Sequence, residues 1–119
     1  MAVTGEPSLG TPKYHRYSFA PAVPGSDAVQ TLDCSGQVPV GTTIVEGYFG
    51  LTATSTSDLV SIMSTSGADF TDRVPCLVSG VTNLGHFKGF LDSSLILRWR
   101  TTGFGTISSI VLVMTCYYC

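Results

Sequence analysis

Four cysteines are the residues best suited to chemistry in this chain of 119 residues. Two of them close the sequence as C-Y-Y-C, the spacing of half a zinc knuckle, and two stand alone: Cys34, Cys76, Cys116 and Cys119. A strand places positions i and i+3 on opposite faces, so Cys116 and Cys119 are poorly placed to share one tetrahedral zinc ion. Two interpretations stay open. The set forms one or two disulfides, including one between subunits through Cys119, or it forms buried free thiols that pack as small apolar side chains.

The two histidines, His15 and His86, each stand beside an aromatic residue, and neither lies in a catalytic motif. The sequence has no G-x-S-x-G, H-E-x-x-H or P-loop pattern. A Ser-His-Asp triad could be assembled on paper from distant residues of any chain so rich in serine, so this possibility is not evidence of catalysis. We therefore expect structural histidines, no catalytic residues and no enzymatic activity.

Acidic residues in A-D-F-T-D-R raise the question of a calcium site. Asp69 and Asp72, with Asp58 from another loop, would supply the oxygen ligands that calcium prefers. Their spacing does not match a closed calcium-binding loop, and Asx-turn capping or an ion pair with Arg73 accounts for them better. We expect no bound metal and no cofactor.

Charged residues are scarce, at 12% of the chain, and the net charge is −2, where about 25% charged residues is usual. The basic residues are scattered, and the two that share one face of a strand, Arg98 and Arg100, fit a solvated or salt-bridged face better than an anion clamp. Without a basic patch, nucleic acid is not an expected partner. No apolar run is long enough to cross a membrane, and the first residues lack the pattern of a secretion signal, so we expect neither a membrane span nor export by the usual route.

Several aromatic residues lie in or beside predicted turns, where flat rings can stack on sugars or on another protein: Tyr48, Phe87, Phe90, Phe104, Tyr117 and Tyr118. Subunit contact is the favoured role, and carbohydrate is the secondary candidate partner. Trp99 alternates with Leu95 and Leu97, which assigns it to the core.

The elements that position these side chains are predicted to be strands. Period-two alternation begins at residue 28 and recurs over six segments: 29–34, 45–53, 57–64, 73–78, 95–100 and 106–119. Pro75 marks its strand as an edge or a bulge. We expect roughly seven or eight short strands in all, these six among them, which predict an all-β fold, a single antiparallel β-sandwich or jelly roll over residues 28–119.

Residues 1–27 contain four of the six prolines and predict an extended N-terminal arm. Within the arm, Tyr14, Tyr17 and Phe19 form a short apolar patch that can add as a strand to the edge of a sheet. A neighbouring subunit is the favoured acceptor, and packing of the arm on its own domain is the alternative.

The last segment, Thr106 to Cys119, is apolar on both sides. One predicted row is Ile110, Leu112, Met114 and Cys116, and the opposite row contains Val111, Val113 and Tyr117. A strand that is apolar on both faces must be covered on both. We predict that Val111, Val113 and Tyr117 meet another subunit, together with the arm residues Tyr14, Tyr17 and Phe19.

Residues 44–112 resemble a CUB-type β-sandwich, on the segments I-V-E-G-Y-F-G-L, S-D-L-V-S-I and S-S-L-I-L-R-W together with Cys76. The resemblance implies an extracellular recognition module, although the cysteine pairing usual in that family is missing. The segment V-P-V-G-T-T-I-V-E-G-Y and the closing Y-Y-C are similar in style to small phage or virus structural proteins.

These patterns together favour a non-enzymatic virion structural protein, such as a capsid decoration, minor capsid or tail component. Its expected partners are further copies of itself and other virion proteins. The alternative is an extracellular ligand- or carbohydrate-binding module of the CUB or lectin type.

Overall fold

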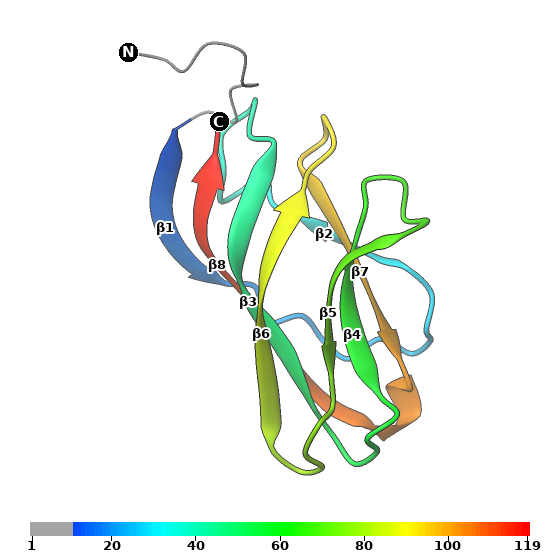
Figure 1. Cartoon of the computed structure of the whole chain (residues 1–119). Helices are drawn as coiled ribbons and strands as arrows, with labels where there is room; N and C mark the ends of the chain where they lie inside the picture. Colours follow the sequence, from blue (N-terminus) through cyan, green and yellow to red (C-terminus); the bar gives the residue numbers. More distant parts are fainter. Residues whose placement is uncertain (1–10) are drawn as a thin grey trace.

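The structure, a computed structural model, describes residues 11–119, which form two four-stranded antiparallel sheets packed face to face (Figure 1). Sheet A has the order β1 (Pro12–Ser18), β8 (Ile107–Tyr118), β3 (Ile44–Ala53) and β6 (Thr82–Phe90). Sheet B has the order β2 (Gln30–Asp33), β7 (Ile96–Thr102), β4 (Leu59–Met63) and β5 (Phe70–Pro75). The predicted all-β sandwich is confirmed.

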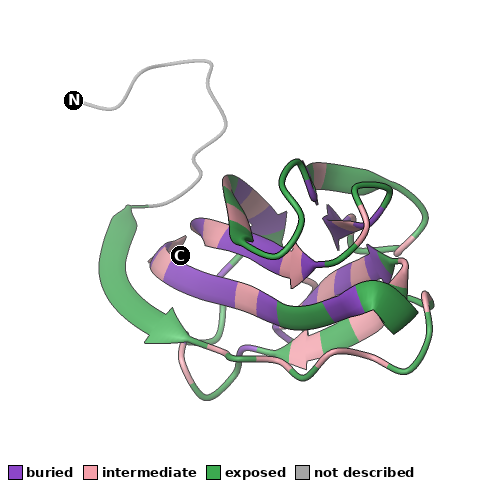
Figure 2. Ribbon diagram, turned by 90° about the horizontal axis from the view of Figure 1, so that it is seen from below, coloured by how far each residue is buried: buried purple, intermediate pink, exposed green. Residues whose placement is uncertain are grey.

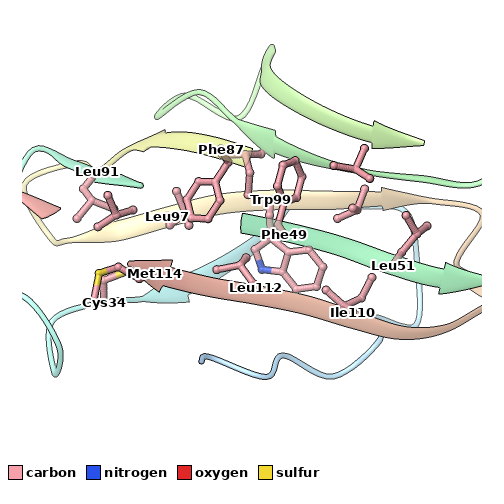
Figure 3. Close-up of a cluster of buried hydrophobic side chains, with 14 of the residues drawn as sticks. Cys34, Phe49, Leu51, Phe87, Leu91, Leu97, Trp99, Ile110, Leu112 and Met114 are labelled. Atoms are coloured by element: carbon pink, nitrogen blue, oxygen red, sulfur yellow. The ribbon is translucent and has the colours of Figure 1, made fainter. Parts of the chain in front are cut away.

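The core lies between the inner faces of the two sheets (Figure 3). Phe49 and Phe87, both fully buried, meet edge to face with ring centroids 5.6 Å apart, a favourable aromatic geometry. Trp99 is 3% exposed and packs in the same cluster, as predicted. Phe87 was expected at the surface and is instead a central core residue, because it points inward from the middle of β6.

Strand β8 is one of the two inner strands of sheet A, paired with β1 on one side and with β3 on the other. The ladder with β3 is interrupted by a bulge, so that Gly47 pairs with Met114 whereas Glu46 pairs with Cys116. The extra residue reverses the alternation beyond it. Tyr117 consequently packs against the core, and Cys116 faces outward beside Glu46. The predicted single row of Val111, Val113 and Tyr117 is therefore wrong.

The outward face of β8 is covered by the protein's own side chains. Val113 pairs with Tyr48 of β3 and with Ser18 of β1, and it is only 3% exposed. Arg16 of β1 donates a hydrogen bond of 2.8 Å to the Tyr48 hydroxyl. Because β1 and β3 flank β8, this bond crosses above the outward face of β8 and helps to cover it. From the sequence we had expected another subunit to cover this face.

The described part of the predicted arm lies on its own domain, as the alternative interpretation held. Strand β1 forms the exposed edge of sheet A (Figure 2). The chain then crosses to sheet B, where the Asp27 carboxylate accepts hydrogen bonds of 3.1 Å from the backbone N–H groups of Gly103 and Phe104. Gly103 has φ +94°, a left-handed conformation that favours glycine. Residues 1–10 of the arm lie outside the described part of the chain.

Two strands differ from their predicted positions. Strand β5 covers Phe70–Pro75 rather than 73–78, and Pro75 ends it at the edge of sheet B. Strand β6 was not predicted, because its inward positions Gly85 and Gly89 give no apolar alternation. A side chain at Gly85 would overlap Val74, and one at Gly89 would overlap Leu97, so both glycines make room for the opposite sheet.

Within residues 11–119 the helical structure is one three-residue turn, Phe104–Thr106, which is far too short to cross a bilayer.

We predict that Gly47→Ala destabilises the fold by about 2 kcal/mol, because a methyl group at this bulge would overlap the backbone carbonyl of Val113. Gly36→Ala is the control, since a Cβ there meets nothing within 4 Å. Urea unfolding of both variants measures the difference. Equal stability of the two variants would contradict the role of this close backbone approach.

Candidate interaction surface

Four large apolar side chains are exposed at the turn between β5 and β6. Leu77, Val78, Val81 and Leu84 are 75%, 55%, 50% and 55% exposed, and we call this group the apolar tip. Leu84 reaches over Gly50, which faces Val111 in the next strand, so the tip continues onto the outer face of sheet A. Exposed apolar side chains that gather in this way are typical of interaction sites.

Asn83, the only asparagine of the chain, holds the tip in one conformation. Its side-chain oxygen accepts hydrogen bonds of 3.2 Å from the backbone N–H groups of Leu77 and Val78. Its amide nitrogen donates to the carbonyl oxygens of Val78 and Val81, both at 3.1 Å. One side chain thus satisfies four backbone groups of the turn.

Two further hydrogen bonds fasten the tip to the end of β3. The Gly80 N–H donates to the carbonyl of Ala53 at 2.8 Å, and the Ser79 hydroxyl donates to the carbonyl of Thr54 at 3.1 Å. The tip therefore sits at the end of the sandwich where β6 begins, the lower end in Figure 1. A turn whose backbone is already held by hydrogen bonds loses little backbone entropy on contact with a partner, which favours binding.

The predicted interface residues of the arm are placed differently from one another. Tyr14 is 87% exposed on the outer face of β1. Tyr17, 39% exposed, makes an edge-to-face contact with Phe19, centroid to centroid 5.1 Å, and Phe19 packs against the core. Tyr14 alone of these three is free to meet a partner without repacking.

Several titratable side chains meet on the outer face of sheet A around Glu46. Its carboxylate lies 3.3 Å from the Lys88 ammonium and 3.9 Å from the His86 ring nitrogen, and it accepts a hydrogen bond of 3.3 Å from the Tyr118 hydroxyl. The Cys116 thiol lies 3.7 Å away. Burial, with the nearby Glu46 charge, raises the pKa of Cys116. A nucleophilic cysteine needs the opposite shift, so the surroundings of Cys116 do not activate its thiol.

His15, the other histidine, lies 3.0 Å from the Gln37 side-chain oxygen.

All four cysteines are free thiols in the structure, with Cys34, Cys76 and Cys116 buried and Cys119 exposed. Burial, aided by the Asp33 charge, raises the pKa of Cys34 to about 12. No three metal-ligating side chains gather within residues 11–119 in a way that would hold an ion. A disulfide between subunits through Cys119 stays a prediction.

The three aspartates considered for calcium are dispersed. Asp58 accepts a hydrogen bond from the Thr106 hydroxyl, and Asp72 accepts the Lys88 backbone N–H at 2.9 Å. Arg73 makes no described ion pair with either neighbouring aspartate and instead lies over the Phe70 ring, 3.8 Å from its centroid. The predicted pairing of Arg73 with an aspartate is thus replaced by a cation–π contact.

The two arginines of β7 have different surroundings. Arg98 forms a salt bridge of 2.8 Å with Asp92, as the favoured interpretation held, whereas Arg100 lines a cavity on the outer face of sheet B.

The apolar tip was missed in the sequence because Leu77 and Val78 extend a strand-like run and were assigned to that strand. A usable signal was present: four large apolar residues surround the turn pair Ser79-Gly80.

Searches of protein-family models, of curated proteins and of solved structures gave no significant match to this chain.

We predict that one thiol, Cys119, reacts rapidly with an aromatic disulfide reagent at pH 8, and that the other three react at the rate of unfolding. A second fast thiol would contradict the burial of Cys34, Cys76 and Cys116.

The raised pKa of Cys34 makes the stability of the fold depend on pH under alkaline conditions. The Cys34 thiol has a pKa near its ordinary value of 9 in the unfolded chain and of about 12 in the folded chain. Ionisation therefore favours the unfolded chain, and we expect the free energy of unfolding to fall as the pH rises from 9 to 12.

Proposed function

We propose that this protein is a non-enzymatic structural protein of a virion, such as a capsid decoration, minor capsid or tail component, whose copies assemble through the apolar tip and the N-terminal arm. The observation that carries the proposal is the exposed, hydrogen-bonded apolar tip. Removing a half-exposed apolar side chain from water is worth about 1 kcal/mol. Four such side chains on each copy offset a large part of the cost of association, about 4–15 kcal/mol.

The strand order supports the virion part of the proposal. The orders β1-β8-β3-β6 and β2-β7-β4-β5 match the arrangement expected of an eight-stranded jelly roll built from two Greek keys, which supports that finer assignment of the sandwich. That architecture is frequent in viral capsid domains and also in lectins. It gives the class of protein by analogy of fold, and the apolar tip gives the reason for assembly.

The arm offers a second contact by exchange between copies. Strand β1 is exposed along its whole length, and it is joined to the sandwich by a segment containing Pro21 and Pro24. The antiparallel register that β1 makes with its own β8 is equally available on the β8 of another copy. Such an exchange keeps every hydrogen bond and links subunits at low cost.

The alternative, an extracellular ligand-binding module, is favoured by the arginine-lined cavity on sheet B. It predicts a monomer at all accessible concentrations.

The tip is tested by the double variant Leu77→Ser and Val81→Ser. We expect the full chain to sediment as concentration-dependent oligomers. The double variant should have a dissociation constant at least about tenfold higher, because about 1–2 kcal/mol of apolar burial is lost per contact. Val40→Ser is the matched control, because Val40 is 92% exposed but lies at the opposite end of the sandwich. A monomeric full chain at high micromolar concentration would overturn the proposal.

Arm exchange is tested by a disulfide between β1 and β8. Tyr14 is the direct register partner of Cys116, so Tyr14→Cys in a Cys119→Ser background should form a bond between these positions on oxidation. We expect covalent dimers and larger species on a non-reducing gel at a level well above that of the His15→Cys control, because exchanged arms add bonds between β1 and β8 to the surface disulfides that any exposed thiol can form. Oxidised material that is entirely monomeric would show that β1 stays on its own chain. His15→Cys, whose side chain lies beside Gln37 instead, is the control.

A further inference from the structure

We propose that the cavity on the outer face of sheet B binds a small sugar acid, whose carboxylate is held by Arg73 and Arg100. The cavity has a volume of about 260 Å³, slightly below the range of about 300–1,000 Å³ that is usual for ligand sites and suited to a small molecule. Its wall includes Ser61, Asp69, Phe70, Arg73, Arg100 and Thr102. These residues come from three neighbouring strands and from the turn before β5, so the site is built on the rigid part of the sandwich.

The register of sheet B places two arginines on either side of one serine. Ser61 of β4 pairs with Arg73 of β5 on one side and with Arg100 of β7 on the other. Side chains of directly paired residues project from the same face of a sheet. The two arginine side chains therefore flank Ser61, which is only 1% exposed, and both line the same cavity.

Neither guanidinium is neutralised by a carboxylate within residues 11–119. The three described ion pairs involve other residues, and Arg98, two positions from Arg100 on the same strand, has its Asp92 partner. The Arg100 Nε is buried and finds no hydrogen-bond partner in the described part of the chain. Arg73 is held by the Phe70 ring and by a bond of 3.4 Å from its Nε to the Ser61 hydroxyl.

Two guanidinium groups that form no ion pair within residues 11–119 match a planar carboxylate, which accepts two parallel N–H bonds. Asp69 on the same wall disfavours a doubly charged phosphate and can accept hydrogen bonds from ligand hydroxyls. The hydroxyls of Ser61 and Thr102 add further polar partners, and the half-exposed Phe70 ring adds an apolar wall. A carboxylate that carries several hydroxyl groups, as in a uronic or sialic acid, fits this combination.

The test is a titration of the full chain with glucuronate, followed by NMR or calorimetry, with glucose, acetate and inorganic phosphate as comparison ligands. We expect glucuronate to bind more tightly than each of the other three. Arg100→Gln and Arg73→Gln should weaken binding about tenfold, since each removes a charged hydrogen bond. Arg100→Lys, which keeps the charge but loses the planar fork, should weaken it several-fold and guards against misfolding of the glutamine variant.

Arg98→Gln is the matched control and should change glucuronate affinity less than about twofold, because it removes the same charge from the same strand outside the cavity. If Arg98→Gln and Arg100→Gln weakened glucuronate binding equally, the effect would come from the net charge of the protein, and the proposed site would be wrong. Glucose, acetate or phosphate binding as tightly as glucuronate would overturn the sugar acid assignment. The proposal does not depend on assembly, and Arg100→Gln should leave the sedimentation of the chain unchanged.

Discussion

The whole structure depends on how β8, a strand that is apolar on both faces, is removed from water. Its inner face packs in the core opposite sheet B. Its outer face is covered at Val113 by the neighbouring strands of the same sheet, with the hydrogen bond from Arg16 to Tyr48 passing above it. Beyond the bulge, Tyr117 turns into the core and Cys116 comes to lie beside Glu46. The chain thus supplies most of the cover that its most apolar segment needs.

This solution makes residues 11–27 of the arm part of the domain, so the contacts with partners must lie elsewhere on the surface. Strand β1 provides one flank of β8, and the Asp27 carboxylate anchors the following segment to the turn at Gly103. With β8 covered, the exposed groups that we propose for association are the apolar tip around Asn83 and the outward side of β1. An exchanged β1 would cover the β8 of a second copy in the same register, so the same contacts would serve folding and assembly.

The sequence was most informative where alternation is undisturbed. The rows of Leu95, Leu97 and Trp99 and of Val45, Phe49 and Leu51 identified β7 and β3, and Pro75 identified an edge. Alternation failed at the bulge after Met114, because one inserted residue reverses the faces without leaving a mark in residue types. It also failed in β6, where Gly85 and Gly89 are dictated by Val74 and Leu97 of the opposite sheet.

The candidate sites were harder to predict than the strands, for a related reason. Which arginine is paired and which is free depends on cross-strand neighbours, and the spacing of Arg98 and Arg100 alone does not distinguish them. The order of the apolar tip depends on four backbone bonds to one asparagine side chain, and only the path of the turn brings those groups together.

Hydrogen–deuterium exchange of the full chain at low and at high micromolar concentration tests the central claim, that copies meet through the apolar tip. We predict that amides of residues 76–84 exchange about tenfold more slowly at the higher concentration, whereas the exchange of amides of residues 35–43 at the opposite end does not change. Exchange at 76–84 that is independent of concentration, in a sample that has formed oligomers, would contradict it.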